Sequence, residues 1–324
     1  MIPVIYKEED DRWIKGDRYL RPLVRRLLRR PPRRRSGMQK VVDNFLKGLD
    51  QLGIRYKLNG SALLTKRAQP VISFGLGMRG LEGVKKDTPV IAAIGFPYPL
   101  ELPQLCEQYN VRKFLQHSEW VLNLTKSAKI YDDEIFDLWS AGIDTTEWQP
   151  RTDLRSRKID VLIYNKLYWD RERQEMQLAQ PIREFLASHG YSHAEIIYGN
   201  YFNDEYKDIL SRSKVMIFLS AHESQGIAYQ ECLSSDVPVI AWDQGQWLDP
   251  VRFKYDRPFV PATSVPFFDE RCGIKFGDAR EFPSRFDQFF DDAMSDKFSP
   301  REFVLENLSI EKSTERMLDI YRSI

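Results

Sequence analysis

The strongest indication of the fold lies in residues 220–243, which read SAHESQGIAYQECLSSDVPVIAWD. An apolar run of strand length, 215–219, comes directly before it, and a second apolar run, 237–241, lies near its end. Between the two runs, Gly226 stands where a helix should begin. The stretch therefore predicts a unit of strand, loop, helix and strand.

Two carboxylates flank the predicted start of this helix. Glu223 and Glu231 are separated by seven residues, so Glu223 falls in the loop at the carboxyl end of the sheet and Glu231 about two turns into the helix. The amides of Gly226, Ile227 and Ala228 lie between them, and free amides at the positive end of a helix dipole form a natural pyrophosphate site. Taken alone, the spacing also fits an exposed acidic pair on a solvated helix.

The rest of the sequence repeats this alternation of strand and helix. Residues 172–189 form a helical stretch that ends before Gly190, and residues 41–52 form another. The strand-length runs are continuously apolar, which is typical of parallel strands covered on both faces. We therefore expect a doubly wound α/β fold, and 324 residues suit two such domains. The further strand-length runs are 89–95, 113–115, 159–164 and 195–198.

Residues 220–241 resemble the retaining glycosyltransferases of the GT-B fold, of the group 1 or family 4 type, which carry a Glu-x7-Glu element followed by a small-residue turn and Pro-Val-Ile-Ala. The resemblance implies two Rossmann-like domains with parallel sheets, facing each other across a cleft. It also implies transfer of a hexose from a nucleotide diphosphate sugar with retention of anomeric configuration. Glu223 would contact the transferred sugar and Glu231 the ribose. The diphosphate would be held by Ser224, Gln225, Gly226, Ile227 and Ala228.

The family also places cations at the end of the first donor-domain strand, as a Gly-Arg pair followed by a Lys. Here that place reads Val161-Leu-Ile-Tyr-Asn-Lys166. The resemblance implies donor contacts from Asn165 and Lys166, with a second charge from Arg171 or Arg173. Lysine keeps the charge of arginine but lacks its planar fork of donors. Surface cations at the start of a helix are the alternative.

The first domain matches the family less well. Residues 36–42 (Ser-Gly-Met-Gln-Lys-Val-Val) resemble its glycine loop and first helix, so Gly37 would bring backbone amides near the donor; a simple helix start is the alternative. The histidine that the family often places after a first-domain strand is absent from residues 93–99. His117 stays unassigned, and His222 is the candidate catalytic histidine because it adjoins Glu223.

Residues 142–150 (Gly-Ile-Asp-Thr-Thr-Glu-Trp-Gln-Pro) resemble the interdomain segment of the family. A charged stretch and a fresh strand follow them. We therefore expect an acceptor-side domain over residues 1–150 and a donor-binding domain over residues 151–308. An amphipathic helix over residues 309–324 should pack back across the domains.

An arginine cluster lies in an insertion near residues 12–35. From Leu20 to Arg35, leucines and Val24 fall at helical spacing while arginines fill the intervening face. Such a helix suits an anionic membrane surface and would imply a lipid-linked or membrane-borne acceptor. An ordinary surface helix is one alternative. A nucleic-acid patch is the least favoured, because no stacking aromatics follow the cluster.

Composition limits the remaining possibilities. The formal net charge of +1 means that the chain as a whole is no polyanion-binding protein. Cys106, Cys232 and Cys272 are far apart and lack metal-ligand spacing, which indicates a reducing cytoplasm. We expect no signal peptide and no membrane-spanning run, so any membrane contact would be peripheral. Since no Asp-x-Asp motif is present, we expect neither a cofactor nor a metal requirement.

Two other functions stay open at this point. A nucleotide-sugar epimerase or phosphorylase could share the two-domain build, and a non-catalytic adaptor could use the arginine cluster to bind membrane or nucleic acid. Release of nucleoside diphosphate from a donor, abolished by Glu223→Ala, would exclude the adaptor.

Overall fold

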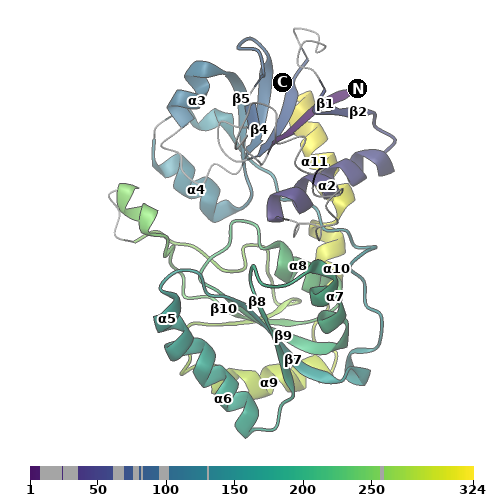
Figure 1. Ribbon diagram of the computed structural model, residues 1–324, viewed down its shortest axis with the longest axis vertical. Coiled ribbons are helices and arrows are strands. Elements are labelled where there is room, and N and C mark those ends of the chain that lie inside the picture. The colour runs from purple at the N-terminus through teal and green to yellow at the C-terminus, as the bar shows by residue number, and fades with distance from the viewer. Residues whose placement is uncertain are drawn as a thin grey trace. The chain divides into compact units, whose positions relative to one another are not determined.

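The structure is a computed structural model, and it describes residues 1–7, 24, 36–60, 69–75, 80–81, 83–94, 102–129, 131–255 and 259–324. The chain divides into two compact units. The first contains Met1–Gln116, Thr125–Trp139 and Thr314–Ile324, and the second contains His117–Leu124 and Ser140–Ser313. Each unit is built around one sheet that carries helices (Figure 1).

The first unit has a six-stranded parallel sheet in the order β2-β1-β3-β4-β5-β6. Helix α2 (Gly37–Gln51) begins after the N-cap Ser36, whose hydroxyl accepts a hydrogen bond from the amide of Gln39 at 3.0 Å. The buried face of α2 includes Phe45, whose ring contacts Phe74 and Trp139. The strands are β1 (Ile2–Lys7), β2 (Tyr56–Leu58), β3 (Val71–Gly75), β4 (Pro89–Ile94), β5 (Asn110–Gln116) and β6 (Phe136–Leu138).

The second unit has a five-stranded parallel sheet in the order β11-β10-β9-β7-β8. Its strands are β7 (Ile159–Lys166), β8 (His193–Ile197), β9 (Ser213–Ser220), β10 (Val239–Trp242) and β11 (Gly273–Phe276). Its helices include α5 (Arg171–Gln174), α6 (Gln180–Ser188), α7 (Asn203–Arg212), α8 (Ile227–Ser234), α9 (Phe282–Met294) and α10 (Pro300–Asn307). A π-helical turn, Glu175–Ala179, joins α5 to α6.

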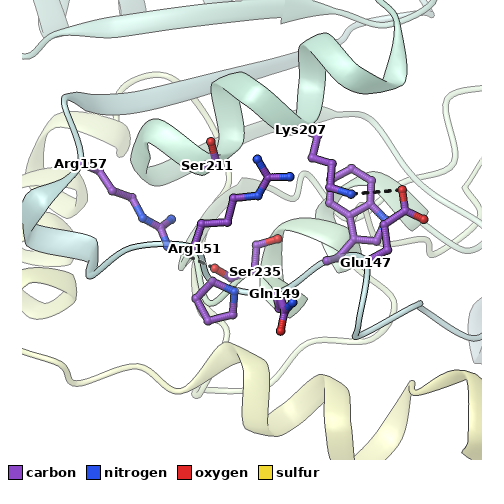
Figure 2. A pocket seen from close by; sticks show the side chains of 9 residues that line it. Glu147, Gln149, Arg151, Arg157, Lys207, Ser211 and Ser235 are labelled. Atoms are coloured by element: carbon purple, nitrogen blue, oxygen red, sulfur yellow. Dashed lines mark hydrogen bonds and ion pairs between the residues drawn. The ribbon is translucent and has the colours of Figure 1, made fainter.

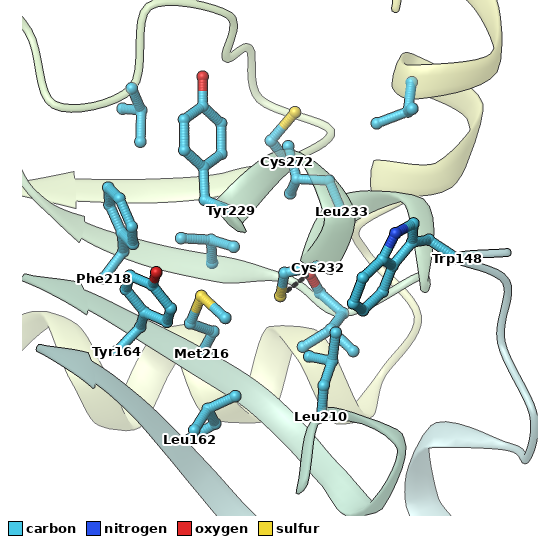
Figure 3. Close-up of a cluster of buried hydrophobic side chains, with 14 of the residues drawn as sticks. Trp148, Leu162, Tyr164, Leu210, Met216, Phe218, Tyr229, Cys232, Leu233 and Cys272 are labelled. Atoms are coloured by element: carbon cyan, nitrogen blue, oxygen red, sulfur yellow. Dashed lines mark hydrogen bonds between the residues drawn. The ribbon is translucent and has the colours of Figure 1, made fainter. Parts of the chain in front are cut away.

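Both faces of the second sheet are buried, which explains why its strands are continuously apolar. On one face, Tyr164 and Phe218 of the strands pack with Tyr229 and Cys232 of α8 (Figure 3). On the other face, strand residues such as Ile163 pack with residues of α6 and α9. A strand with helices on both sides has no polar face to present.

The order of the strands creates a switch point beside β7. The chain leaves β7 for β8 on one side and then returns to β9 on the other side of β7. The connections that leave the carboxyl ends of β7, toward β8, and of β9, toward β10, therefore run in opposite directions, and the crevice left at such a point is where doubly wound sheets bind ligands. In the first unit, β1 lies in the same way between β2 and β3.

The expected fold class, two Rossmann-like α/β domains with parallel sheets, is confirmed. The domain limits differ in detail from residues 150 and 308, because the segment after Trp139 already lies against the second unit. There the amide of Ile143 donates to the carbonyl of Leu308 at 2.8 Å. Two helices cross the division: α4 (Glu119–Ser127) and α11 (Ile310–Arg322).

None of the helices in the described part of the chain is long and apolar enough to cross a membrane. The arginine cluster from Leu20 to Arg35 lies outside the described residues, apart from Val24.

Candidate functional site

The candidate site is formed where β7 and β9 end. Lys166 is the last residue of β7, Ser220 is the last residue of β9, and Glu223 follows three residues later. The Lys166 ammonium lies 2.7 Å from Oε1 and 2.8 Å from Oε2 of Glu223, and the Ser220 hydroxyl donates to Oε1 at 2.9 Å. The Lys166 side chain is 25% exposed and that of Glu223 only 8%, so the pair is open to solvent mainly on the lysine side.

The backbone of Glu223 is fixed on both sides. Its amide donates to the carbonyl of Thr263 at 3.0 Å, and its carbonyl accepts from the indole Nε1 of Trp120 at 2.7 Å. Trp120 belongs to the first half of α4, which groups with the second unit. These bonds leave Glu223 little freedom to change its position.

Lys166 keeps its charge despite its environment. Burial lowers the pKa of its ammonium, but the Glu223 carboxylate and Tyr198 together outweigh burial and raise that pKa above its usual value. The ammonium also lies 4.5 Å from the centre of the Tyr198 ring, a distance typical of a cation–π contact. The site therefore holds a permanent cation.

His222 is held between two indole rings. Its ring centre lies 5.9 Å from that of Trp120 and 6.5 Å from that of Trp247. Burial, with smaller contributions from Lys166 and Arg252, lowers the pKa of His222 to about 4. Its Nε2 atom is buried without a hydrogen-bond partner. His222 is therefore neutral near pH 7.

Helix α8 begins beside Glu223, as the sequence predicted. Gly226 is its N-cap with φ +81°, and a Cβ built there would lie 2.1 Å from the Tyr229 ring, so only glycine fits. The first hydrogen bond back to the cap runs from the Gln230 amide to the Gly226 carbonyl at 3.2 Å. The amides of residues 227–229 therefore have no acceptor within the helix.

Glu231 lies one turn further along α8 and is 2% exposed. The hydroxyl oxygens of Tyr164 and Tyr201 are 2.6 Å apart. Burial raises the pKa of both tyrosines, and the negative charge of Glu231 contributes to this rise. Both acids of the predicted pair thus belong to the region around the start of α8.

The side chains of Asn165 and Gln225 make their hydrogen bonds inside the protein. The Asn165 amide donates to Glu195 at 2.8 Å and to Glu175 at 3.3 Å. The Gln225 side chain forms hydrogen bonds with the backbone of Ala141 and with the side chain of Gln230. The side-chain amides of Asn165 and Gln225 therefore connect the protein segments that surround the site.

The remaining predicted positions lie at the surface or in the other unit. Ser224 is exposed. Arg171 and Arg173 are exposed at the start of α5; Arg173 bonds to Gln177, whereas Arg171 has no recorded partner in the part of the chain that the structure describes. Gly37 begins α2 of the first unit, and a Cβ there would meet nothing within 4 Å. The local structure at Gly37 is thus an ordinary helix start.

Trp120 and Thr263 shape the site but belong to no pattern that the sequence analysis recognises, and Ser220 and Gln230 lie within residues 220–243 without a role predicted for them. Trp120 is 103 residues away from Glu223 in the chain. Only the folded structure brings such distant residues together.

A separate small pocket lies near the amino ends of β7 and β9, at the other end of these strands from the candidate site (Figure 2). Arg157 lines it and donates to the carbonyls of Ser213 and Ser235, which lie just beyond the carboxyl ends of α7 and α8. Lys207, also in its lining, pairs with Glu147 at 3.3 Å. Cations at helix carboxyl ends are stabilising, so these residues have a structural explanation.

No protein family matches the sequence, and no curated protein is similar to it in sequence. Several solved structures share its fold. A glycosyltransferase from Rickettsia africae ESF-5 has 10% identity and a TM-score of 0.57, with 99% of this chain and 98% of that chain covered. Anabaena HepE, solved in complex with UDP and glucose, has 9% identity and a TM-score of 0.59, with 100% of both chains covered. The apo form of the lipopolysaccharide outer core galactosyltransferase WaaB has 11% identity and a TM-score of 0.56, again with 100% of both chains covered. At such identities the likeness is one of fold, and the chain has the two-domain GT-B fold of these glycosyltransferases.

Proposed function

We propose that this protein is a glycosyltransferase that takes a sugar from a nucleotide diphosphate sugar bound at the switch point of the second unit. One observation carries the proposal: a permanent cation, a fixed carboxylate and the free amides at the start of α8 meet where β7 and β9 end. A diphosphate needs cations and amide donors, and a sugar needs a carboxylate for its hydroxyls. That HepE was solved with UDP-glucose agrees with this class of donor.

In this proposal each residue of the site contacts the part of the donor that suits its charge. The amides of residues 227–229 and Lys166 bind the diphosphate and stabilise the charge that it gains as it leaves. Glu223 accepts hydrogen bonds from the sugar, and Glu231 accepts them from the ribose. Arg171, exposed at the start of α5, offers a second cation. His222 is neutral near pH 7, so it acts by position and hydrogen bonding rather than by charge.

The finer parts of the proposal follow from the sequence resemblance. The transferred group would be a hexose, its anomeric configuration would be retained, and no metal would be required. The acceptor would be a glycan or a lipid-linked molecule, reached by a cytoplasmic protein that binds the membrane surface through Leu20–Arg35.

Titration calorimetry with a panel of nucleoside diphosphates and their parent nucleosides tests the donor site. We expect one diphosphate to bind clearly more tightly than its nucleoside. Lys166→Met should weaken diphosphate binding about tenfold or more, because a charge-assisted contact is lost, and should leave nucleoside binding nearly unchanged.

Lys207→Met is the matched control, since Lys207 also pairs with a glutamate and lies 5.4 Å from an aromatic ring centre, but in the lining of the separate pocket. Its diphosphate affinity should equal that of the wild type. If no diphosphate binds the wild-type protein, the proposed function is wrong and a non-catalytic adaptor becomes the better hypothesis.

A further inference from the structure

Two buried glutamines bond to each other across the start of α8. Gln225 precedes the N-cap Gly226, and Gln230 lies in the first turn of the helix. The Gln225 amide nitrogen donates to Oε1 of Gln230 at 2.9 Å, and the Gln230 amide nitrogen donates to the backbone carbonyl of Gln225 at 2.7 Å. Gln225 is 6% exposed and Gln230 is fully buried.

The bonds of this pair satisfy nearly all of its polar atoms. Nε2 of Gln225 also donates to the Ala141 carbonyl at 3.4 Å, and its Oε1 accepts from the Ala141 amide at 2.9 Å. Nε2 of Gln230 also approaches the Tyr229 hydroxyl at 3.3 Å. A buried polar network that is fully bonded is rigid, because every rearrangement leaves a desolvated donor or acceptor without a partner.

This network acts on the backbone that would bind the diphosphate. The Gln225 carbonyl belongs to the peptide unit whose nitrogen is that of Gly226, so the bond from Gln230 fixes the plane of that peptide. The left-handed φ of Gly226 then sets the direction of the amides of residues 227–229. Helix α8 has no side-chain cap that could do this instead.

We propose that Gln225 and Gln230 are positioning residues, which hold the amino end of α8 in its diphosphate-binding geometry before the donor arrives. The inference rests on the proposed function and adds to it the residues that preorganise the phosphate site. Preorganised donors bind a charged group more tightly because no ordering is needed at the moment of binding.

The test compares the affinities of a nucleoside diphosphate and its nucleoside, measured by calorimetry on the wild type and on Gln230→Met. Methionine has a similar length but cannot bond to the Gln225 carbonyl. We expect the diphosphate to bind about tenfold more weakly and the nucleoside to bind as before, because only the phosphates use these amides. Gln230→Leu, which also lacks the donor to the Gln225 carbonyl and adds no charge, should shift the ratio of diphosphate to nucleoside affinity in the same direction and serves if the methionine variant does not fold.

A control variant is needed to show that a loss of stability alone does not change the ratio of diphosphate to nucleoside affinity. Ile182→Ala removes a buried side chain of α6 on the other face of the sheet, so it should lower the melting temperature without changing the ratio of the two affinities. If the Gln230 variants lower the melting temperature but keep the wild-type ratio, the pair serves folding only and the inference is overturned. If the wild type itself binds no nucleoside diphosphate, both the proposed function and this inference fail.

Discussion

Glu223 and Lys166 form the ion pair at the centre of the candidate site. Each charge partly neutralises the other, so removing one of them changes how strongly the other attracts a charged ligand. Glu223→Gln keeps the size of the side chain and removes its negative charge. We expect this variant to bind nucleoside diphosphate at least as tightly as the wild type, because Lys166 no longer has a competing carboxylate. Release of nucleoside diphosphate from the donor sugar should nevertheless fall on the order of 100-fold, because an interaction with the reacting sugar is lost.

Calorimetry and a coupled assay of nucleoside diphosphate release measure these two effects separately. Glu147→Gln is the control, since Glu147 pairs with Lys207 away from the site, and it should change neither quantity. Equal activity of Glu223→Gln and the wild type would contradict the role given to Glu223.

The half-buried His222, whose Nε2 atom is buried, should make the protein less stable in mild acid. Its pKa is about 4 when folded and about 6.5 in an unfolded chain, so the unfolded state binds the additional proton between these values. The contribution of His222 to stability is complete above about pH 6.5 and is lost as the pH falls toward 4. Over this range the free energy of unfolding falls with a slope that approaches about 1.4 kcal/mol per pH unit.

Urea unfolding of the wild type and His222→Asn at several pH values checks this effect. The wild type should lose more stability than the variant between pH 6.5 and 4.5. His193→Asn, which changes an exposed histidine, should follow the wild type. Parallel curves for the wild type and His222→Asn would show that the ring is not buried in its neutral form.

Among single residues, the sequence allowed a role to be predicted only for those that lie within or next to a recognisable pattern. Lys166 ends one continuously apolar strand and Glu223 follows another, so both were expected at the carboxyl edge of a parallel sheet; only the strand order shows that the two strands are neighbours. Trp120 and Thr263, which fix the backbone of Glu223, come from distant segments with no such pattern. Nor could a sequence reveal that Asn165 and Gln225 would bond inward, since either amide could equally face a ligand.

At the scale of elements, the start of α8 depends on Gly226 for two reasons, its left-handed φ and the nearby Tyr229 ring. Gly226→Ala should therefore destabilise the protein by more than the roughly 1 kcal/mol expected for alanine at a left-handed glycine position. Gly190→Ala separates the two causes, because Gly190 has φ +76° but nothing within 4 Å of its added Cβ.

Chemical denaturation should give a larger loss of stability for Gly226→Ala than for Gly190→Ala. Gly226→Ala should also weaken nucleoside diphosphate binding, whereas Gly190→Ala should not, since Gly190 follows the carboxyl end of α6. Equal losses of stability for the two variants would mean that the Tyr229 ring moves aside at no cost.

Elements with long apolar runs could be predicted, and short or half-exposed ones could not. Strands β7 and β9 are buried on both faces, so their sequences are distinctive. Strands β2 and β6 have only three residues each, and β11 has four, of which only the first and the last are buried. The short apolar run of β1 leads directly into charged residues, so its sequence does not distinguish a strand.

At the scale of the whole molecule, the two units repeat one topology. In each, the first strand lies inside the sheet, between the second and third strands of that unit, which creates a switch point at its carboxyl end. Among the described residues, the paired cation and carboxylate followed by a glycine-capped helix occur at the switch point of the second unit. We therefore assign the donor to the second unit.

Hydrogen–deuterium exchange of backbone amides, with and without a saturating nucleoside diphosphate, tests that assignment most directly. We expect the amides of residues 227–229, which have no acceptor within α8, to exchange more slowly when the diphosphate is bound, because they donate to its phosphates. Unchanged exchange at these three amides, with protection appearing elsewhere in the chain, would contradict the assignment.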